Sequence, residues 1–121
     1  MNIIYIEDTR RPERNLEYKE IIHNLGFSDY VSYCNTVEPR YFLSLKADGI
    51  ICHSGMSGYE VVNHFAKEKG WPLLSYSGSV NSSPFLKKIK FSDNHYSVDS
   101  EYFELALPQF IEICRNHSNN D

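Results

Sequence analysis

Short apolar runs alternate with helical stretches along the whole chain, and this alternation limits the possible folds more than any other feature of the sequence. The first run, residues 2–6, consists mainly of β-branched and aromatic side chains and is followed directly by Glu7 and Asp8. A short, nearly continuous apolar run of this kind is typical of a strand buried on both faces. By the same criteria we expect strands at residues 2–6, 30–34, 49–52, 72–76 and 95–98.

The stretches between these strands carry helix signals. Pro12 stands at the start of the first stretch, where its missing N–H is tolerated, and Gly26 stands just past the end. Pro108 is expected to kink the last helix or to restart it. We expect helices at residues 12–25, 38–45, 59–69, 84–90 and 100–114. This alternation predicts an α/β protein, a three-layer sandwich in which helices cover both faces of a five-stranded parallel sheet.

The size and composition of the chain fit one folded domain. It has 121 residues, of which 41% are hydrophobic and 23% are charged. We expect the domain to span residues 1–115, with the polar residues 116–121 forming a frayed tail.

The charge balance and the cysteines exclude several classes of protein. Twelve Lys and Arg residues against sixteen Asp and Glu residues give a formal net charge of −4, which excludes a strongly basic nucleic-acid footprint for the chain as a whole. No run approaches the ~20 apolar residues that span a bilayer, and the chain does not open like a signal peptide. The three cysteines lie far apart, without C-x-x-C spacing, as expected of reduced thiols. We therefore expect a cytoplasmic protein that binds neither nucleic acid nor membrane.

In a parallel α/β sheet, functional groups gather beyond the carboxyl ends of the strands, at the point where the strand order reverses. This rule selects a small set of positions for chemistry. They are residues 7–8, 34–35, 53–58, 75–79 and 98–99.

At these positions the chain resembles the receiver domain of two-component response regulators. The resemblance lies in three segments, in the order in which the family has them: "NIIYIEDTRRPERNLEYKEIIHNLGF", "ADGIICHSGMSGYEVVNHF" and "WPLLSYSGS". The second segment has a loop a few residues shorter than is usual for the family, and the resemblance fades beyond about Ser83. It implies the receiver, or flavodoxin-like, topology.

The resemblance also assigns family roles to four residues. In a receiver, acidic side chains after the first strand hold Mg²⁺, and a hydroxyl residue after the fourth strand holds a phosphoryl oxygen. Glu7 and Asp8 match the acidic pair, Ser77 matches the hydroxyl residue and Gly78 matches the small residue that follows it. The resemblance thus implies Mg²⁺ as the one candidate cofactor, held weakly by Glu7 and Asp8, since Mg²⁺ prefers octahedral oxygen and two carboxylates supply little of it. The alternative is a pair of exposed loop carboxylates.

Two residues that the chemistry of the family requires are missing. The phosphoryl-accepting aspartate at the end of the third strand is replaced by His53, and no lysine follows Lys90, although the family has one after its fifth strand. The chain thus resembles a degenerate receiver, or pseudo-receiver. The pocket that remains would consist of Glu7, Asp8, His53, Ser77 and Gly78.

Several interpretations of His53 stay open. Our preferred one is an imidazolium that replaces the missing cation and pairs with the neighbouring carboxylates, which closes the pocket without Mg²⁺. His53 is otherwise a phosphoryl acceptor, a metal ligand together with Asp8 or Glu7, or a solvated loop histidine.

A candidate protein-binding face lies further along the chain. Lys87, Lys88 and Lys90 alternate with apolar residues, which predicts a helix with one buried and one solvated side. In receivers the fourth helix, fifth strand and fifth helix form the face that meets partners. The corresponding residues are Phe85, Lys87, Lys88, Tyr96 and Tyr102.

Together these features predict a stand-alone receiver-like protein that is not an enzyme. It would bind another protein, a signalling protein or a second copy of itself, independently of phosphorylation. Two alternatives are an active phosphorelay receiver that uses His53 with Mg²⁺ at Glu7 and Asp8, and an α/β module that binds a small ligand.

Overall fold

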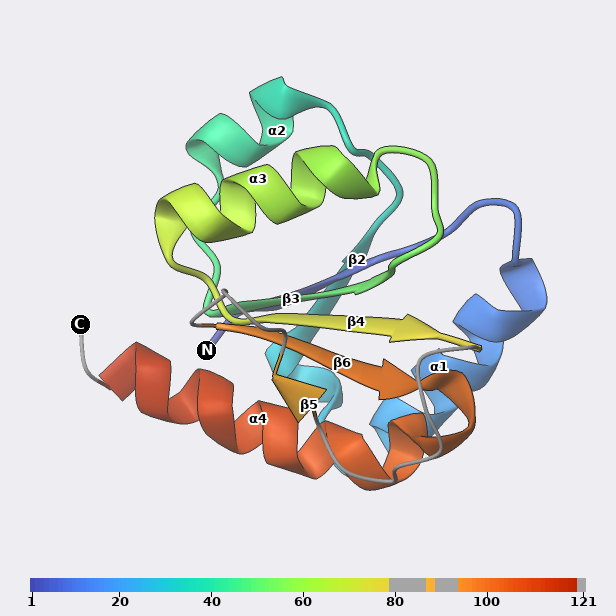
Figure 1. Cartoon of the computed structure of the whole chain (residues 1–121). Coiled ribbons are helices and arrows are strands. Elements are labelled where there is room, and N and C mark those ends of the chain that lie inside the picture. The colour runs from blue at the N-terminus through green and yellow to red at the C-terminus, as the bar shows by residue number, and fades with distance from the viewer. Residues whose placement is uncertain (79–86, 89–93, 120–121) are drawn as a thin grey trace.

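A computed structural model describes residues 1–78, 87–88 and 94–119 of the chain. It contains one sheet with the strand order β2-β1-β3-β4-β6-β5 (Figure 1). Its strands are β1 (Ile3–Ile6), β2 (Val31–Cys34), β3 (Gly49–His53), β4 (Leu73–Ser77), β5 (Lys87–Lys88) and β6 (His95–Asp99). All of them are parallel except β5, which runs antiparallel to β6 at the edge. The five parallel strands thus have the flavodoxin-like order, as predicted.

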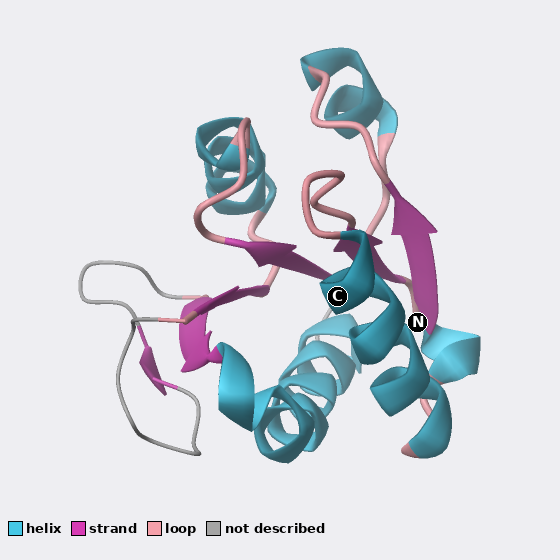
Figure 2. Cartoon of the chain, turned by 90° about the vertical axis from the view of Figure 1, so that its right-hand side faces the viewer, coloured by secondary structure: helices cyan, strands magenta, loops and turns pink. Residues whose placement is uncertain are grey.

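Four α-helices cover the two faces of the sheet in the described part of the chain. They are α1 (Pro12–Asn24), α2 (Pro39–Ser44), α3 (Tyr59–Lys69) and α4 (Phe103–Asn119). Helices α1 and α4 pack together on one face, and α2 and α3 pack together on the other (Figures 1 and 2). The predicted three-layer α/β sandwich is therefore confirmed.

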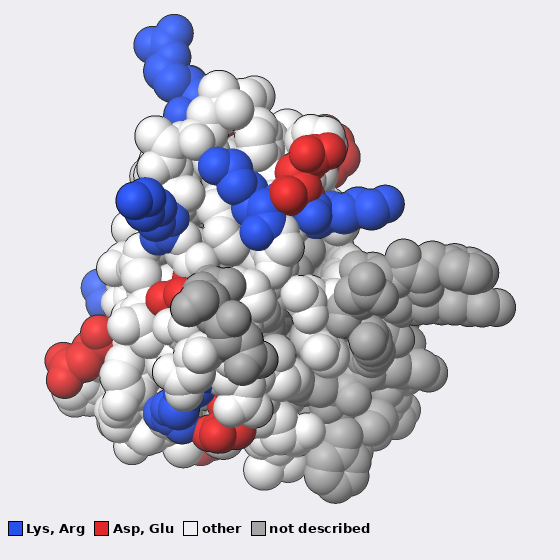
Figure 3. Space-filling view, turned by 90° about the vertical axis from the view of Figure 1, so that its left-hand side faces the viewer, with Lys and Arg blue, Asp and Glu red and all other residues white. Residues whose placement is uncertain are grey.

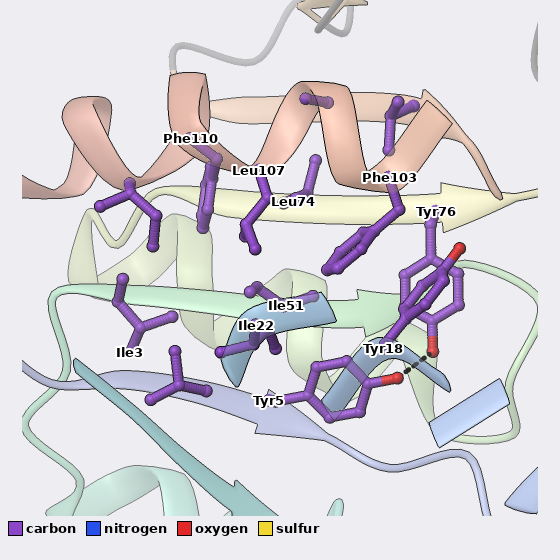
Figure 4. Close-up of a cluster of buried hydrophobic side chains, with 14 of the residues drawn as sticks. Ile3, Tyr5, Tyr18, Ile22, Ile51, Leu74, Tyr76, Phe103, Leu107 and Phe110 are labelled. Carbon is purple, nitrogen blue, oxygen red and sulfur yellow. Dashed lines mark hydrogen bonds between the residues drawn. The ribbon is translucent and has the colours of Figure 1, made fainter. Parts of the chain in front are cut away.

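Each strand in the middle of the sheet contributes side chains to two cores, because successive side chains point to opposite faces. In β1, Ile3 and Tyr5 join the core under α1 and α4, whereas Ile4 and Ile6 join the core under α2 and α3. The first core is rich in aromatic rings (Figure 4), and the Tyr18 and Phe103 rings stack within it with centroids 3.8 Å apart. Burial on both faces explains why β1 is apolar at every position.

The predicted helix at residues 84–90 is wrong for the part of it that the structure describes. Lys87 and Lys88 form β5, in register with Ser97 and Tyr96 of β6. Residues 88–91 alternate charged and apolar side chains with a period of two, which suits a strand as well as a helix. The open edge of β6 supplies backbone partners for a strand. The rest of the predicted helix, with Phe85, lies outside the described residues.

The last helix also differs from the prediction. A 3₁₀ turn, η2 (Ser100–Tyr102), precedes α4, and α4 continues through Pro108 without a restart. One lost hydrogen bond is outweighed by packing, because α4 buries side chains on both sides of the proline at helical spacing. These are Phe103, Ala106, Leu107, Phe110, Ile111 and Cys114. The helix ends at Asn119, so residues 116–119 are helical and are not the frayed tail that we expected.

Candidate functional site

The sheet brings the end of β1 next to the end of β3, at the point where the strand order reverses. Tyr5 is in register with Ile51, so the chain that follows β1 meets His53, the last residue of β3. His53 is in turn in register with Tyr76 of β4. Asp8, His53 and the end of β4 therefore share one edge of the sheet, as the sequence predicted.

Asp8 is the centre of this site. Its side chain is almost completely buried, and its carboxylate accepts hydrogen bonds from two residues. His53 Nδ1 lies 3.0 Å from Oδ2, and Arg10 donates from its backbone N–H and from Nε to Oδ1, at 3.1 and 3.2 Å. Arg10 Nη2 also reaches Oδ2 at 3.4 Å. The site thus surrounds a buried carboxylate with cationic and N–H donors.

These donors decide the ionisation of Asp8. Burial alone would raise the pKa of the Asp8 carboxyl, but the hydrogen bonds from Arg10 and His53 and the charge of Arg10 outweigh burial and lower this pKa. Asp8 is therefore ionised at neutral pH. Because an ionised carboxylate only accepts hydrogen bonds, Nδ1 of His53 carries the shared proton.

Arg10 also holds the loop that follows β3. Its Nη2 donates to the carbonyl oxygen of Gly55 at 2.8 Å. That loop passes so close to His53 that a Cβ on Gly55 would lie 3.0 Å from His53 Cε1. Farther along, Gly58 precedes α3 with φ +88°, and a Cβ there would lie 2.5 Å from Val37 Cγ2. Gly58 requires a glycine, because of its positive φ and the close contact, whereas a side chain at Gly55 would press on the His53 ring.

A closed ring of contacts fixes Asp8 and His53 relative to each other. The His53 ring packs against the Tyr76 ring, with centroids 5.3 Å apart. The Tyr76 and Tyr5 hydroxyls are 3.0 Å apart (Figure 4), and the Tyr5 hydroxyl donates to Asn15 Oδ1 at 3.2 Å. Asn15 Nδ2 then donates to the Asp8 carbonyl oxygen at 2.9 Å. Burial raises the pKa of both tyrosines, so their hydroxyls stay neutral donors.

Three of the five residues predicted for the pocket line one cavity. His53, Ser77 and Gly78 line a cavity of about 330 Å³. Asp8 does not line it but contacts His53 Nδ1. Glu7 is half-buried and lines a separate cavity with Pro12 and Leu16. Consecutive residues that leave a strand point to opposite sides, so Glu7 does not join the cavity that His53 lines.

The contact with Asp8 also bears on the interpretations of His53. His53 lies in a strand and is 8% exposed, so it is not a solvated loop histidine. The preferred interpretation requires contacts between His53 and the neighbouring carboxylates. The contact with Asp8 is present, whereas no hydrogen bond or ion pair joins His53 to Glu7 within the described residues.

Glu7 and Asp8 share the wall of one cavity, of about 220 Å³, which bears on the predicted metal site. Arg10 lines the same cavity, and its guanidinium charge opposes a dication there. Within residues 1–78, 87–88 and 94–119, no group of three or more His, Cys, Asp or Glu side chains is placed to hold a metal ion.

The sequence analysis did not identify the arginines that surround this site. Arg10, Arg11 and Arg14 stand at the amino end of α1. The positive end of a helix dipole disfavours cations there. Three arginines at such a place were the signal that could have identified them.

The residues of the predicted protein-binding face are only partly placed. Tyr96 and Tyr102 are half-buried and pack against the core under α1 and α4. Lys87 and Lys88 belong to β5, and Phe85 lies outside the described residues. None of the helices that the structure describes is long and apolar enough to cross a membrane.

A second polar cluster lies on the opposite face of the sheet, under α3. His95 Nε2 is 2.8 Å from the Tyr59 hydroxyl and 3.0 Å from Ser75 Oγ. Burial lowers the pKa of His95 and raises the pKa of Tyr59 to about 12. Ser75 and His95 are 3% and 8% exposed, so this hydroxyl–imidazole pair is enclosed by packed protein.

The fold and the site can be set against known proteins at this point. Comparison with protein-family models, with curated proteins and with solved structures finds no match to the chain.

Proposed function

We propose that this chain is a receiver-like protein-interaction module that works without phosphorylation. The observation that carries the proposal is the contact of His53 Nδ1 with the buried Asp8 carboxylate, which Arg10 completes. The residue at the position of a phosphoryl acceptor is thereby committed to a neighbouring side chain.

The electrostatics support the part of the proposal that excludes phosphorylation. A cluster of carboxylates needs a dication and an ammonium group to neutralise it. Here Asp8 meets a guanidinium group and an imidazole instead, because Arg10 and His53 occupy both of its oxygens. A dication at Asp8 would have to displace them.

The closed ring of contacts supports the part of the proposal that concerns protein binding. Asp8, His53, Tyr76, Tyr5 and Asn15 hold one another from three elements, β1, β3 and β4, and from the first turns of α1. A site held in this way needs no chemical input to adopt its conformation. The module then presents one fixed surface to a protein partner or to a second copy of the chain.

The absence of phosphoryl chemistry is tested by intact mass. The full chain is incubated with a small phosphodonor and Mg²⁺, beside an active receiver domain as the positive control. We expect the control to gain one phosphoryl group and this chain to remain unmodified. An adduct that disappears in His53→Ala would overturn the proposal and would establish His53 as the acceptor.

Protein binding is tested by charge reversal at β5. We expect Lys87→Glu with Lys88→Glu to abolish a self-association seen by sedimentation, or the capture of a partner. A matched control reverses the charge of two other exposed lysines, Lys46, which follows α2, and Lys67, which lies in α3. On the face that Figure 3 shows, the Lys and Arg side chains gather mainly where α2 and α3 lie. A chain that neither self-associates nor retains a partner would contradict the proposal.

A further inference from the structure

A cavity of about 330 Å³ lies beside His53 at the carboxyl edge of the sheet. Its wall consists of Arg11, Arg14, His53, Ser77 and Ser100, with Gly78 and the Tyr76 ring completing it. Four segments supply this wall: the start of α1, the ends of β3 and β4, and the 3₁₀ turn η2. Convergence of polar groups at this edge is typical of ligand sites in parallel sheets.

The charge of the wall is unusual for this chain. The chain as a whole has a formal net charge of −4, but among the residues that the structure describes, the cavity wall contains two guanidinium groups and no carboxylate. Asp8, the carboxylate that contacts His53, is also engaged by Arg10. Arg11 is farther from it, with Nε 3.9 Å from Asp8 Oδ2. The described part of the wall is therefore cationic, although Asp8 partly offsets the charge of Arg11 and Glu17 that of Arg14.

Arg14 is held in place at this wall. Its Nη1 donates to the Tyr18 hydroxyl at 3.2 Å, and its guanidinium carbon lies 5.4 Å from the centroid of the Tyr18 ring. The Tyr18 hydroxyl in turn donates to the carbonyl oxygen of Ser100 at 2.8 Å. These contacts leave the other nitrogen atoms of the guanidinium group for a ligand. A pre-positioned arginine loses little side-chain entropy when it binds.

His53 provides a third polar group, through a ring nitrogen that accepts a hydrogen bond in the neutral imidazole and donates one in the imidazolium. Asp8 occupies Nδ1, so Nε2 is the ring nitrogen that remains for a ligand in the cavity. A carboxylate that holds one ring nitrogen fixes the tautomer and the direction of the other. The wall thus combines two forked cations with an oriented imidazole.

We propose that this cavity binds a small phosphomonoester reversibly and without a covalent step. Guanidinium forks match the oxygens of phosphate and carboxylate groups, so both classes of anion share the chemistry. Two guanidinium groups from the start of α1 and the imidazole at the end of β3 fit a tetrahedral phosphate better than a planar carboxylate, and the cavity has room for an organic group beside the phosphate. The inference goes beyond the proposed function, which needs no ligand.

Titration followed by ¹H–¹⁵N NMR tests this site on the full chain. The probes are phenyl phosphate, inorganic phosphate and benzoate, each against sodium chloride at matched ionic strength. We expect saturable shifts of the His53, Gly78 and Ser100 amides, with phenyl phosphate binding at least threefold more tightly than inorganic phosphate and benzoate binding most weakly. Shifts confined to other surfaces, or equal affinity for benzoate, would overturn the inference.

Substitution of the two arginines provides the decisive comparison. Arg11→Gln with Arg14→Gln should weaken phenyl phosphate binding at least tenfold, while Arg40→Gln, which removes an exposed arginine from α2, should leave the affinity unchanged. The spectrum of each free variant reports whether it is folded, and Arg11→Gln alone tests the site if the double variant is not. Equal affinity in the double variant and the Arg40 control would refute the site.

The two proposals fail in different ways. Absence of saturable binding overturns the phosphomonoester site and leaves the protein-interaction module intact. A covalent phosphoryl adduct, detected by intact mass after the titration, contradicts both reversible binding here and the proposed function.

Discussion

Two histidines in this protein are equally buried but have opposite surroundings. His53 and His95 are each 8% exposed. His53 Nδ1 meets the ionised Asp8 carboxylate at 3.0 Å, whereas His95 Nε2 meets the neutral hydroxyls of Tyr59 and Ser75. Burial lowers the pKa of His95, whose hydrogen-bond partners are neutral hydroxyls. The partner that the fold provides, more than the depth of burial, therefore decides what a buried imidazole can do.

The positions of the two histidines follow the same division. His53 ends β3 at the carboxyl edge and lines a cavity. His95 begins β6 and joins strands β4 and β6 to α3 through its hydroxyl partners. We therefore interpret the first as part of a site and the second as part of the packing.

The largest expected effect is the loss of the carboxylate at the first histidine. Asp8→Ala should lower the free energy of unfolding by about 3 kcal/mol, because it leaves the buried His53 and the Asp8-facing donors of Arg10 without an acceptor. Urea denaturation monitored by circular dichroism measures this loss.

The second histidine provides the control for that prediction. Ser75→Ala removes a neutral hydrogen-bond partner of His95 and should cost only about 1 kcal/mol. Equal losses in the two variants would show that the carboxylate adds nothing beyond an ordinary hydrogen bond, and the contrast between the two sites would disappear.

A smaller effect is expected behind His53, in the ring of tyrosine hydroxyls. Tyr5→Phe should cost about 1–3 kcal/mol, because the Tyr76 hydroxyl and Asn15 Oδ1 each lose a buried partner. Tyr5→Phe combined with Tyr76→Phe removes both hydroxyls of the pair, so the double variant should lose less than twice the single cost. Denaturation of the three variants gives the coupling energy, and strict additivity would argue against a closed ring.

Much of the fold could be predicted from periodicity alone. The central strands β1, β3 and β4 correspond to apolar runs that burial on both faces requires, and β1 is the clearest case. The segment around Lys87 could not be predicted, because a period-two alternation fits a strand or a helix and the edge of β6 decides between them. The path of α4 through Pro108 depends on packing, which local propensity does not include.

The candidate site was predictable only in part. Asp8 and His53 could be placed together because both follow parallel strands. The contact of Arg10 with the Gly55 carbonyl depends on a side-chain rotamer and on a loop distant in sequence. The Tyr5–Tyr76 contact joins two hydroxyls across the sheet, and a sequence does not show which tyrosines have their hydroxyls buried against each other.

The smallest effect, and the sharpest test of the contrast, is the dependence of stability on pH. The pKa of His95 in the folded protein lies below its unfolded value of ~6.5, so the unfolded chain binds more protons below that pH. The stability that neutral His95 provides is fully present above about pH 6.5 and is lost as the pH falls toward the folded pKa. Asp8 also has a lowered pKa, but its contribution is lost only below its unfolded value of ~3.9.

The two sites should therefore weaken in separate pH ranges. Between pH 8 and pH 5, the stability of the wild type relative to His95→Gln should decrease as the pH falls, by no more than about 1.4 kcal/mol per pH unit, the limit for one proton. Asp8→Asn should keep the His95 dependence and remove part of the loss below about pH 4. His64→Gln, which removes an exposed histidine from α3, controls for the loss of an imidazole. A difference between wild type and His95→Gln that grows as the pH falls would mean that His95 gains a proton more readily in the folded protein, and hydroxyl partners alone could not then explain its environment.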